Sequence, residues 1–152
     1  MMRLSLPLVF LIYAQAVLAQ ELVFSTAAVD QCLATGQTEA CIGLSSAACQ
    51  QNTPGGDTTV GMIGCLDREL SYWDGALNYY YQDLRNQDPD RAEDLKQLQR
   101  SWIAYRDATC GYEAAEFQGG TFAGIAATDC HLRLTGRQTL YLRGVHTDLM
   151  QR

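Results

Sequence analysis

The sequence predicts an all-α fold, a disulfide-stapled bundle of three long helices with a small helical, Cys-rich N-terminal head. Three observations predict it. Apolar residues recur at alternating steps of three and four along two long stretches, and less regularly along a third. β-branched residues never alternate with polar residues over the length of a strand. Six cysteines follow an apolar leader, which is typical of a secreted disulfide framework.

Residues 1–19 are predicted to be a cleaved signal peptide of the bacterial Sec type. Arg3 precedes an apolar run over residues 4–18, and Ala19 ends a small-residue cleavage site before Gln20. The alternative is a membrane anchor, but a spanning helix needs about 20 apolar residues and this run is shorter. Because Gln20 and not cysteine follows the cut, we expect no lipid or membrane anchor and a periplasmic or secreted mature protein.

The remaining chain is acidic. Of the 11 Lys and Arg residues, Arg3 leaves with the leader, so ten basic residues face 17 acidic ones, a formal charge of −7. This charge argues against a nucleic-acid partner, because phosphate binding requires a basic face. A cationic protein partner is favoured, since opposite net charges speed encounter.

Two parts are expected after the leader: a Cys-rich head with its turn at residues 20–56, and a bundle at residues 57–152. The head should hold two short helices near residues 29–33 and 39–44, broken at Gly36. Gly and Pro between residues 52 and 57 predict a turn. Asp57, Thr58 or Thr59 can then cap the first long helix.

Three long helices are predicted at residues 59–85, 89–117 and 122–144. Asp88 is expected to cap the second, with Pro89 at its first position. The inward residues of the first are expected to be Leu66, Leu70, Trp73, Leu77, Tyr80 and Leu84; of the second, Leu95, Leu98, Trp102, Tyr105, Thr109 and Tyr112; and of the third, Ile125, Leu134, Tyr141 and Val145.

The six cysteines are read as three disulfides. Zinc sites use tight pairs such as C-x2-C, and the sequence has none, nor a C-x-x-C-H attachment for haem. The residues alone leave 15 connectivities open.

Motifs in the bundle carry a family resemblance. Trp102, Tyr105, Arg106, Asp107 and Cys110 form W-x-x-Y-R-D-x-x-C, followed by G-G-T at residues 119–121 and by C-x4-T-x-R-x-x-L at residues 130–140. Upstream, Cys65 precedes a D-x-x-L-N-x-x-Y pattern at residues 74–81. Together these resemble the lysozyme inhibitor LprI-like family over residues 49–143. The resemblance implies a small secreted or lipid-anchored helical protein of the bacterial envelope, in a family named for an inhibitor of lysozyme.

The resemblance also suggests a disulfide pairing. Cys32 and Cys41 lie outside the family pattern, so they are expected to pair with each other across Gly36. Cys49 then pairs with Cys65, and Cys110 with Cys130.

No enzyme, cofactor or metal site is predicted. His131 and His146 lie 15 residues apart, about four helical turns, so they cannot share an ion. No nucleophile elbow, phosphate-binding glycine loop or H-E-x-x-H motif occurs. Five carboxylates could in principle supply an acid and a base, although solvated helix faces routinely carry such residues: Asp67, Glu69, Asp74, Glu113 and Glu116.

Arg106 and Asp74 are expected to be at least half buried, and a buried charge needs a partner. We therefore predict a structural ion pair of Arg106 with Asp74 or with Asp129. Arg137 is a second candidate for such a pair. Asp107 is expected to be solvated.

Two surfaces are candidates for binding a partner. Tyr72 and Tyr79 lie one heptad apart outside the apolar stripe, and tyrosine is enriched at interfaces. The loop of Gln118, Gly119, Gly120 and Thr121 would be held rigid by a Cys110–Cys130 disulfide, so little ordering entropy would be lost on binding. Trp73, Leu77, Trp102 and Tyr105 are assigned to the core.

Two functions remain open at this point. One is a protein-binding module that inhibits a cationic lysozyme by blocking its cleft. The other is a non-catalytic structural or adaptor protein of the envelope.

Overall fold

The computed structural model describes residues 21–36 and 38–152, so the predicted signal peptide and Gln20 lie outside the described residues. The head holds α1 (Ala27–Thr35), the 3-10 turn η1 (Glu39–Cys41) and α2 (Leu44–Asn52). The bundle holds α3 (Thr59–Gln87), the 3-10 turn η2 (Pro89–Arg91), α4 (Ala92–Ala115) and α5 (Thr121–Met150). The predicted all-α fold is confirmed, and the described residues contain no strand.

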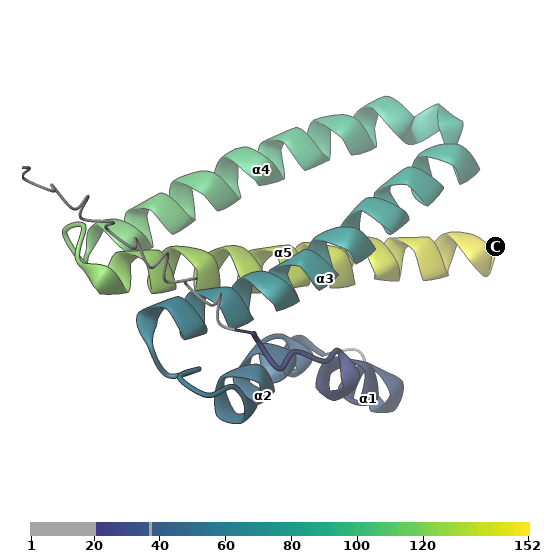
Figure 1. The fold of residues 1–152 in the computed structure, drawn as a ribbon. Coiled ribbons are helices and arrows are strands. Elements are labelled where there is room, and N and C mark those ends of the chain that lie inside the picture. The colour runs from purple at the N-terminus through teal and green to yellow at the C-terminus, as the bar shows by residue number, and fades with distance from the viewer. Residues whose placement is uncertain (1–20, 37) are drawn as a thin grey trace, which may run out of the picture.

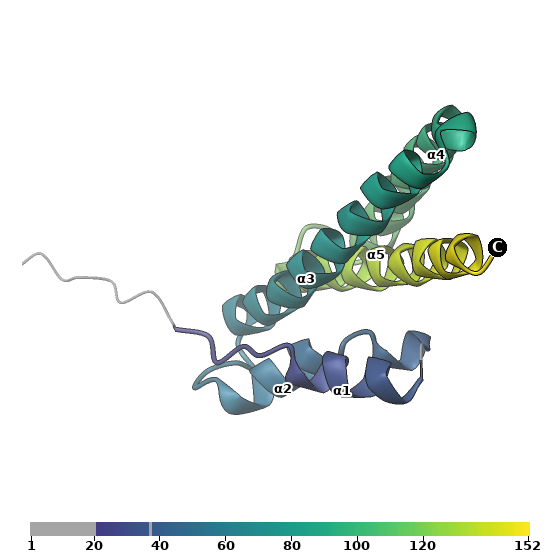
Figure 2. The ribbon, with the colours of Figure 1, turned by 90° about the vertical axis from the view of Figure 1, so that its right-hand side faces the viewer.

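The helices α3 and α5 cross as a long packed pair, and α4 runs back beside them as the outer helix of the bundle (Figures 1 and 2). The head lies against the other side of this pair. Leu77 and Leu84 of α3 meet Leu142 of α5 at one end of the core, and Trp102 of α4 packs against them. Among the described residues, no helix combines the length and apolar character needed to cross a membrane.

The second part of the core joins the head to the bundle. Val29 and Cys41 of the head pack with Leu66 and Trp73 of α3 and Leu132 of α5, and all five are buried. Gly136 of α5 is also buried. The side chain of Ile42 from the head packs so close to it that a Cβ at residue 136 would collide with it.

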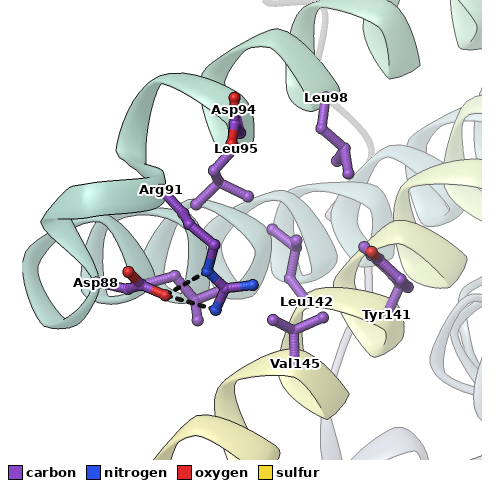
Figure 3. Close-up of a pocket in the computed structure, with 9 residues that line it drawn as sticks. Asp88, Arg91, Asp94, Leu95, Leu98, Tyr141, Leu142 and Val145 are labelled. Atoms are coloured by element: carbon purple, nitrogen blue, oxygen red, sulfur yellow. Dashed lines mark hydrogen bonds and ion pairs between the residues drawn. The ribbon is translucent and has the colours of Figure 1, made fainter.

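Helix ends agree with the sequence analysis at α3 but not at α4. The Thr58 side chain accepts a hydrogen bond from the Gly61 amide (3.1 Å), so Thr58 is the cap among the three predicted candidates. Asp88 occupies the N-cap position of η2 with Pro89 following it, as expected, but its side chain makes no capping hydrogen bond and its carboxylate is bound by Arg91 instead (Figure 3). The α-helix therefore starts at Ala92, after the η2 turn. α5 runs on to Met150, beyond the predicted end at Gly144.

The inward face of α4 is rotated from the predicted stripe. Gln99 and Cys110 are buried and Trp102 is partly buried, whereas Leu98, Tyr105 and Tyr112 are 36%, 58% and 83% exposed. The assignment of Tyr105 to the core is therefore wrong. The Cys110–Cys130 disulfide and the Gln138–Gln99 hydrogen bond (2.6 Å) determine which side of α4 faces α5.

All three disulfides are the predicted ones: Cys32–Cys41, Cys49–Cys65 and Cys110–Cys130. The first lies within the head, the second joins α2 to α3, and the third joins α4 to α5. Their Cα atoms lie 5.5, 5.6 and 5.4 Å apart, within the range that a disulfide bridges.

Glu69 connects the head to the bundle and is fully buried, so it does not lie on a solvated helix face. One carboxylate oxygen accepts hydrogen bonds from the Gly43 amide (2.7 Å) and the Trp73 indole (2.9 Å). The other accepts one from the Ser46 amide (2.6 Å). Glu69 thus caps the N-terminus of α2 from a different helix, where the amide donors have no partner within their own helix.

A second polar contact joins the same two parts. The Tyr72 hydroxyl of α3 donates to the Asp30 carboxylate of α1 (2.9 Å). Burial, followed by this hydrogen bond, raises the pKa of Tyr72 to about 12.

Replacing Glu69 with Gln is expected to destabilise the protein by about 2 kcal/mol and to lower the melting temperature by about 7 °C. Only one oxygen remains in the amide, so its NH₂ group must face at least one of the three donors. Thermal unfolding followed by circular dichroism measures this. Asp67→Asn is the matched control, because Asp67 is exposed on the same helix. Equal melting temperatures for the two variants would contradict the role of Glu69.

The Tyr72 contact predicts a loss of stability at alkaline pH. Its folded pKa of about 12 lies above the value of about 10 in an unfolded chain. Folding therefore favours the protonated hydroxyl, and the resulting stability is complete below about pH 10 and is lost between about pH 10 and 12. Tyr72→Phe should remove this part of the pH dependence in urea unfolding, whereas Tyr79→Phe should retain it. A Tyr72→Phe profile parallel to the wild type excludes the assignment.

Candidate functional site

The end of the bundle where α4 turns into α5 presents an exposed loop, residues 117–122, which we call the tip. Gln118 and Gly119 adopt left-handed φ values of 49° and 77°, and the Gly120 amide donates to the Phe117 carbonyl (2.8 Å). Glycine at residue 119 fits this conformation, which other residues adopt only with strain. The predicted binding loop, Gln118 to Thr121, is thus a defined turn whose four residues are all exposed.

Two aromatic rings bracket this turn. Phe117 and Phe122 stack with their ring centroids 5.8 Å apart, and they are 39% and 57% exposed. The tip carries no charged residue. The sequence analysis missed both phenylalanines, although their positions on either side of the Gly119-Gly120 pair were a visible signal.

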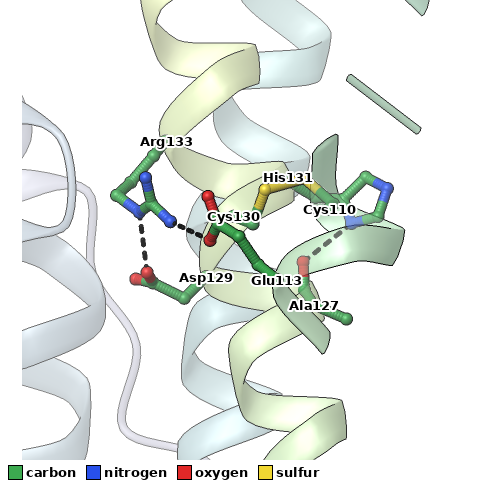
Figure 4. A network of polar contacts seen from close by, with 7 residues as sticks. All are labelled: Cys110, Glu113, Ala127, Asp129, Cys130, His131 and Arg133. Atoms are coloured by element: carbon green, nitrogen blue, oxygen red, sulfur yellow. Dashed lines mark hydrogen bonds and ion pairs between the residues drawn. A yellow bond between two sulfur atoms is a disulfide. The ribbon is translucent and has the colours of Figure 1, made fainter. Parts of the chain in front are cut away.

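The base of the tip is cross-linked in two ways. Cys110 and Cys130 form a fully buried disulfide between α4 and α5. Beside it, Arg133 of α5 binds Glu113 of α4 (2.7 Å) and Asp129 of its own helix (2.8 Å), as Figure 4 shows. The hydrogen bond that Arg133 donates to the Asp129 carboxylate is the largest of the causes that raise the pKa of Arg133. The two helices are therefore held together directly behind the exposed turn.

The predicted ion pair of Arg106 with Asp74 or Asp129 is wrong. The Arg106 guanidinium lies over the Trp102 ring, 4.9 Å from its centroid, and binds the neighbouring Asp107 (2.8 Å). Cation–π contact with Trp102 and one partly exposed carboxylate satisfy this charge without a carboxylate from α3.

The proposed partners of Arg106 are engaged elsewhere. Asp74 is exposed and accepts a hydrogen bond from Asn78 one turn along α3 (3.0 Å), and Asp129 binds Arg133. Asp74 and Arg106 line a common groove between α3 and α4, but no hydrogen bond or ion pair joins them.

Arg137, the second candidate for a pair within the bundle, instead reaches the head. Its guanidinium binds Glu39 (2.7 Å), and both side chains are about half exposed. An exposed ion pair of this kind contributes little to stability, so Arg137 mainly orients the head on α5.

The structure separates the two tyrosines that the sequence analysis grouped. Tyr72 is partly buried, with its hydroxyl bound to Asp30 and its ring edge against Trp73. Tyr79 is 61% exposed and touches only Tyr80 among the aromatic residues of the described chain. Of this pair, Tyr79 alone offers a ring to a partner.

A small apolar pocket of about 150 Å³ lies between the start of α4 and the end of α5. Figure 3 shows Leu95, Leu98 and Tyr141 around it, with the Asp88–Arg91 pair at one side. Most of its lining is aliphatic.

The two histidines contact different carboxylates at different ends of the bundle. His131 lies 3.7 Å from Asp107, and His146 contacts the Asp83 carboxylate (2.7 Å) at the other end of the bundle. Within the described part of the chain, no three His, Cys, Asp or Glu side chains are placed to hold a metal ion. The tip is the candidate surface that combines exposed aromatic rings with a defined turn.

Comparison with known proteins places these features in a family. An uncharacterized 17.7 kDa protein from the puhA 5′ region of Rhodobacter capsulatus is 25% identical, with 73% of this chain and 80% of that protein covered. An uncharacterized protein of Rhizobium meliloti is 31% identical over 52% of this chain and 67% of its own length. No solved structure matches the chain. The model of the family described as Lysozyme inhibitor LprI matches residues 49–142, a segment that includes α3, α4, the tip and most of α5. Since this match spans more than half of the chain, the protein belongs to the LprI family of lysozyme inhibitors.

Proposed function

We propose that this protein is an exported lysozyme inhibitor whose tip enters the sugar-binding cleft of the enzyme. The observation that carries the proposal is the tip itself, a stacked Phe117–Phe122 pair around an uncharged turn, held by a buried disulfide and the Arg133 bridge. Family membership supports the choice of lysozyme as the partner.

The chemistry of the tip suits such a cleft. A lysozyme cleft binds a chain of sugar rings between two carboxyl groups. An uncharged tip meets no repulsion from these carboxyl groups, and flat aromatic rings can occupy the space of sugar rings. Because the turn is already ordered, little conformational entropy is lost when it binds.

Net charge supports the encounter with a cationic lysozyme. After loss of the leader the chain has a formal charge of −7, and opposite charges raise association rates at low ionic strength. Export to the periplasm or the medium follows from the predicted signal peptide and agrees with the family. Blocking a cleft requires no catalytic residue, cofactor or metal.

The basic test is the clearing of a cell-wall suspension by lysozymes of each class, with purified residues 20–152 added at micromolar concentration. Slower clearing with at least one lysozyme supports the proposal. Unchanged clearing with every class would favour the alternative, a non-catalytic structural or adaptor protein of the envelope.

Substitution of both tip phenylalanines, F117A together with F122A, is expected to weaken inhibition about 30-fold, the effect of losing roughly 2 kcal/mol of binding free energy. Inhibition constants from the clearing assay measure this, and an unchanged melting curve confirms the fold. Tyr79→Ala is the control, since it removes an exposed ring from α3 and should leave the constant unchanged. The reverse outcome, with Y79A weakened and the tip variant intact, would move the inhibitory surface to α3.

The Cys110–Cys130 disulfide is expected to keep the tip ordered before it binds, which is a different contribution from the contacts of the phenylalanine rings. Replacing both Cys110 and Cys130 with Ala should weaken inhibition about tenfold at a temperature where the variant is still folded, because the turn must then be ordered on binding. Isothermal titration with the inhibited lysozyme should show the loss as a less favourable entropy. C32A with C41A is the control, since that disulfide lies in the head. If both double variants inhibit equally well, the order of the tip is not what determines affinity.

A further inference from the structure

The outer helix α4 carries a continuous stripe of exposed residues, of which only Leu98, at one end, also lines the apolar pocket against α5. The stripe residues recur at alternating steps of three and four, which places them along one side of the helix. We call this set the α4 stripe: Leu98, Ser101, Tyr105, Ala108, Tyr112 and Ala115. Its largest members, Tyr105 and Tyr112, are 58% and 83% exposed.

The α4 stripe is uncharged from end to end in a strongly acidic protein. It spans about 26 Å at a rise of 1.5 Å per residue. One flank of the stripe is formed by the residues that directly precede its three large members. These residues are also uncharged, and two of the three are small: Gln97, Ala104 and Gly111. A solvated helix face in an acidic chain would be expected to carry charges along such a length, so this face is suited to contact with protein.

Large and small residues alternate strictly along the stripe. The first, third and fifth residues of the stripe are large: Leu98, Tyr105 and Tyr112. The second, fourth and sixth are small: Ser101, Ala108 and Ala115. We propose that the α4 stripe is the interface of a homodimer in which two copies of α4 pack antiparallel about a two-fold axis.

This arrangement makes the stripe complementary to itself. With the axis near the middle of the stripe, Leu98 faces the partner subunit's Ala115, Ser101 faces the partner subunit's Tyr112, and Tyr105 faces the partner subunit's Ala108. Each large side chain then meets a small one, so the two helices can approach closely without a clash between large side chains. A parallel pair would place tyrosine on tyrosine and alanine on alanine, which leaves both clashes and gaps.

If the stripe is fully covered, its exposed area reaches the lower limit for a specific contact. A tyrosine side chain can bury 150–250 Å², so Tyr105 and Tyr112 together expose about 300 Å² per subunit. Two subunits therefore contribute about 600 Å² from tyrosine alone, more than half of the roughly 1,000 Å² of a specific interface. Leu98 and the small residues of the stripe supply the remainder.

The net charge of the subunits determines how the affinity of the dimer depends on salt. Each subunit carries a formal charge of −7 after loss of the leader, so association of two copies is opposed by repulsion that salt screens. We therefore expect the dimer to strengthen with ionic strength. The complex with a cationic lysozyme should weaken under the same conditions, which separates the two associations.

Sedimentation equilibrium of residues 20–152 between about 1 and 100 µM, at low and moderate salt, tests the proposal. The wild-type chain should dimerise with rising concentration. Ala108→Tyr should weaken the dimer at least about tenfold, because it sets tyrosine against the partner subunit's Tyr105. The swapped variant, Y105A with A108Y, should restore the dimer, because each large side chain again meets a small one.

Controls make each outcome decisive. Tyr79→Ala, on an exposed position outside the stripe, should dimerise like the wild type. Unchanged circular dichroism of A108Y shows that the fold is intact, and its unchanged lysozyme inhibition keeps this test apart from that of the tip. A chain that is monomeric at every concentration, or a swap that fails to restore what A108Y removes, overturns the proposal. So does association that appears only when lipid vesicles are added.

Discussion

A single buried carboxylate determines how the two parts of this protein fit together. Glu69 lies inside the joint between head and bundle, where it accepts hydrogen bonds from the Gly43 and Ser46 amides and from the Trp73 indole. Burying a charge is costly unless its hydrogen bonds are satisfied, so the head can dock only where these three donors converge. The remaining contacts of the joint, including Tyr72 with Asp30 and Arg137 with Glu39, are consistent with that position.

Much of the fold could be predicted from the sequence, because it depends on local patterns. The period of the apolar residues located the three long helices, and turn residues located most of their ends. The α4 face was predicted wrongly because Leu98, Tyr105 and Tyr112 follow the same period as a buried stripe, whereas the Cys110–Cys130 disulfide selects a neighbouring face. Glu69 was missed because its two amide donors come from residues more than 20 positions away, and no local pattern distinguishes it from a solvated glutamate.

The candidate site could be predicted only in part for the same reason. The loop from Gln118 to Thr121 was identified from its glycines, but the stacking of Phe117 on Phe122 depends on how α4 enters the turn. Arg106 was assigned a carboxylate partner across the bundle, yet its own helix supplies both Trp102 and Asp107. Family motifs thus indicated which residues are notable without indicating what each contacts.

The order of the disulfides has a consequence for biogenesis. The six cysteines pair consecutively: the first with the second, the third with the fourth and the fifth with the sixth. The disulfides are Cys32–Cys41, Cys49–Cys65 and Cys110–Cys130. A chain that enters an oxidising compartment N-terminus first exposes its thiols in this same order. Bonding each thiol to the next one to appear would therefore give the native connectivity directly, with no exchange between pairs.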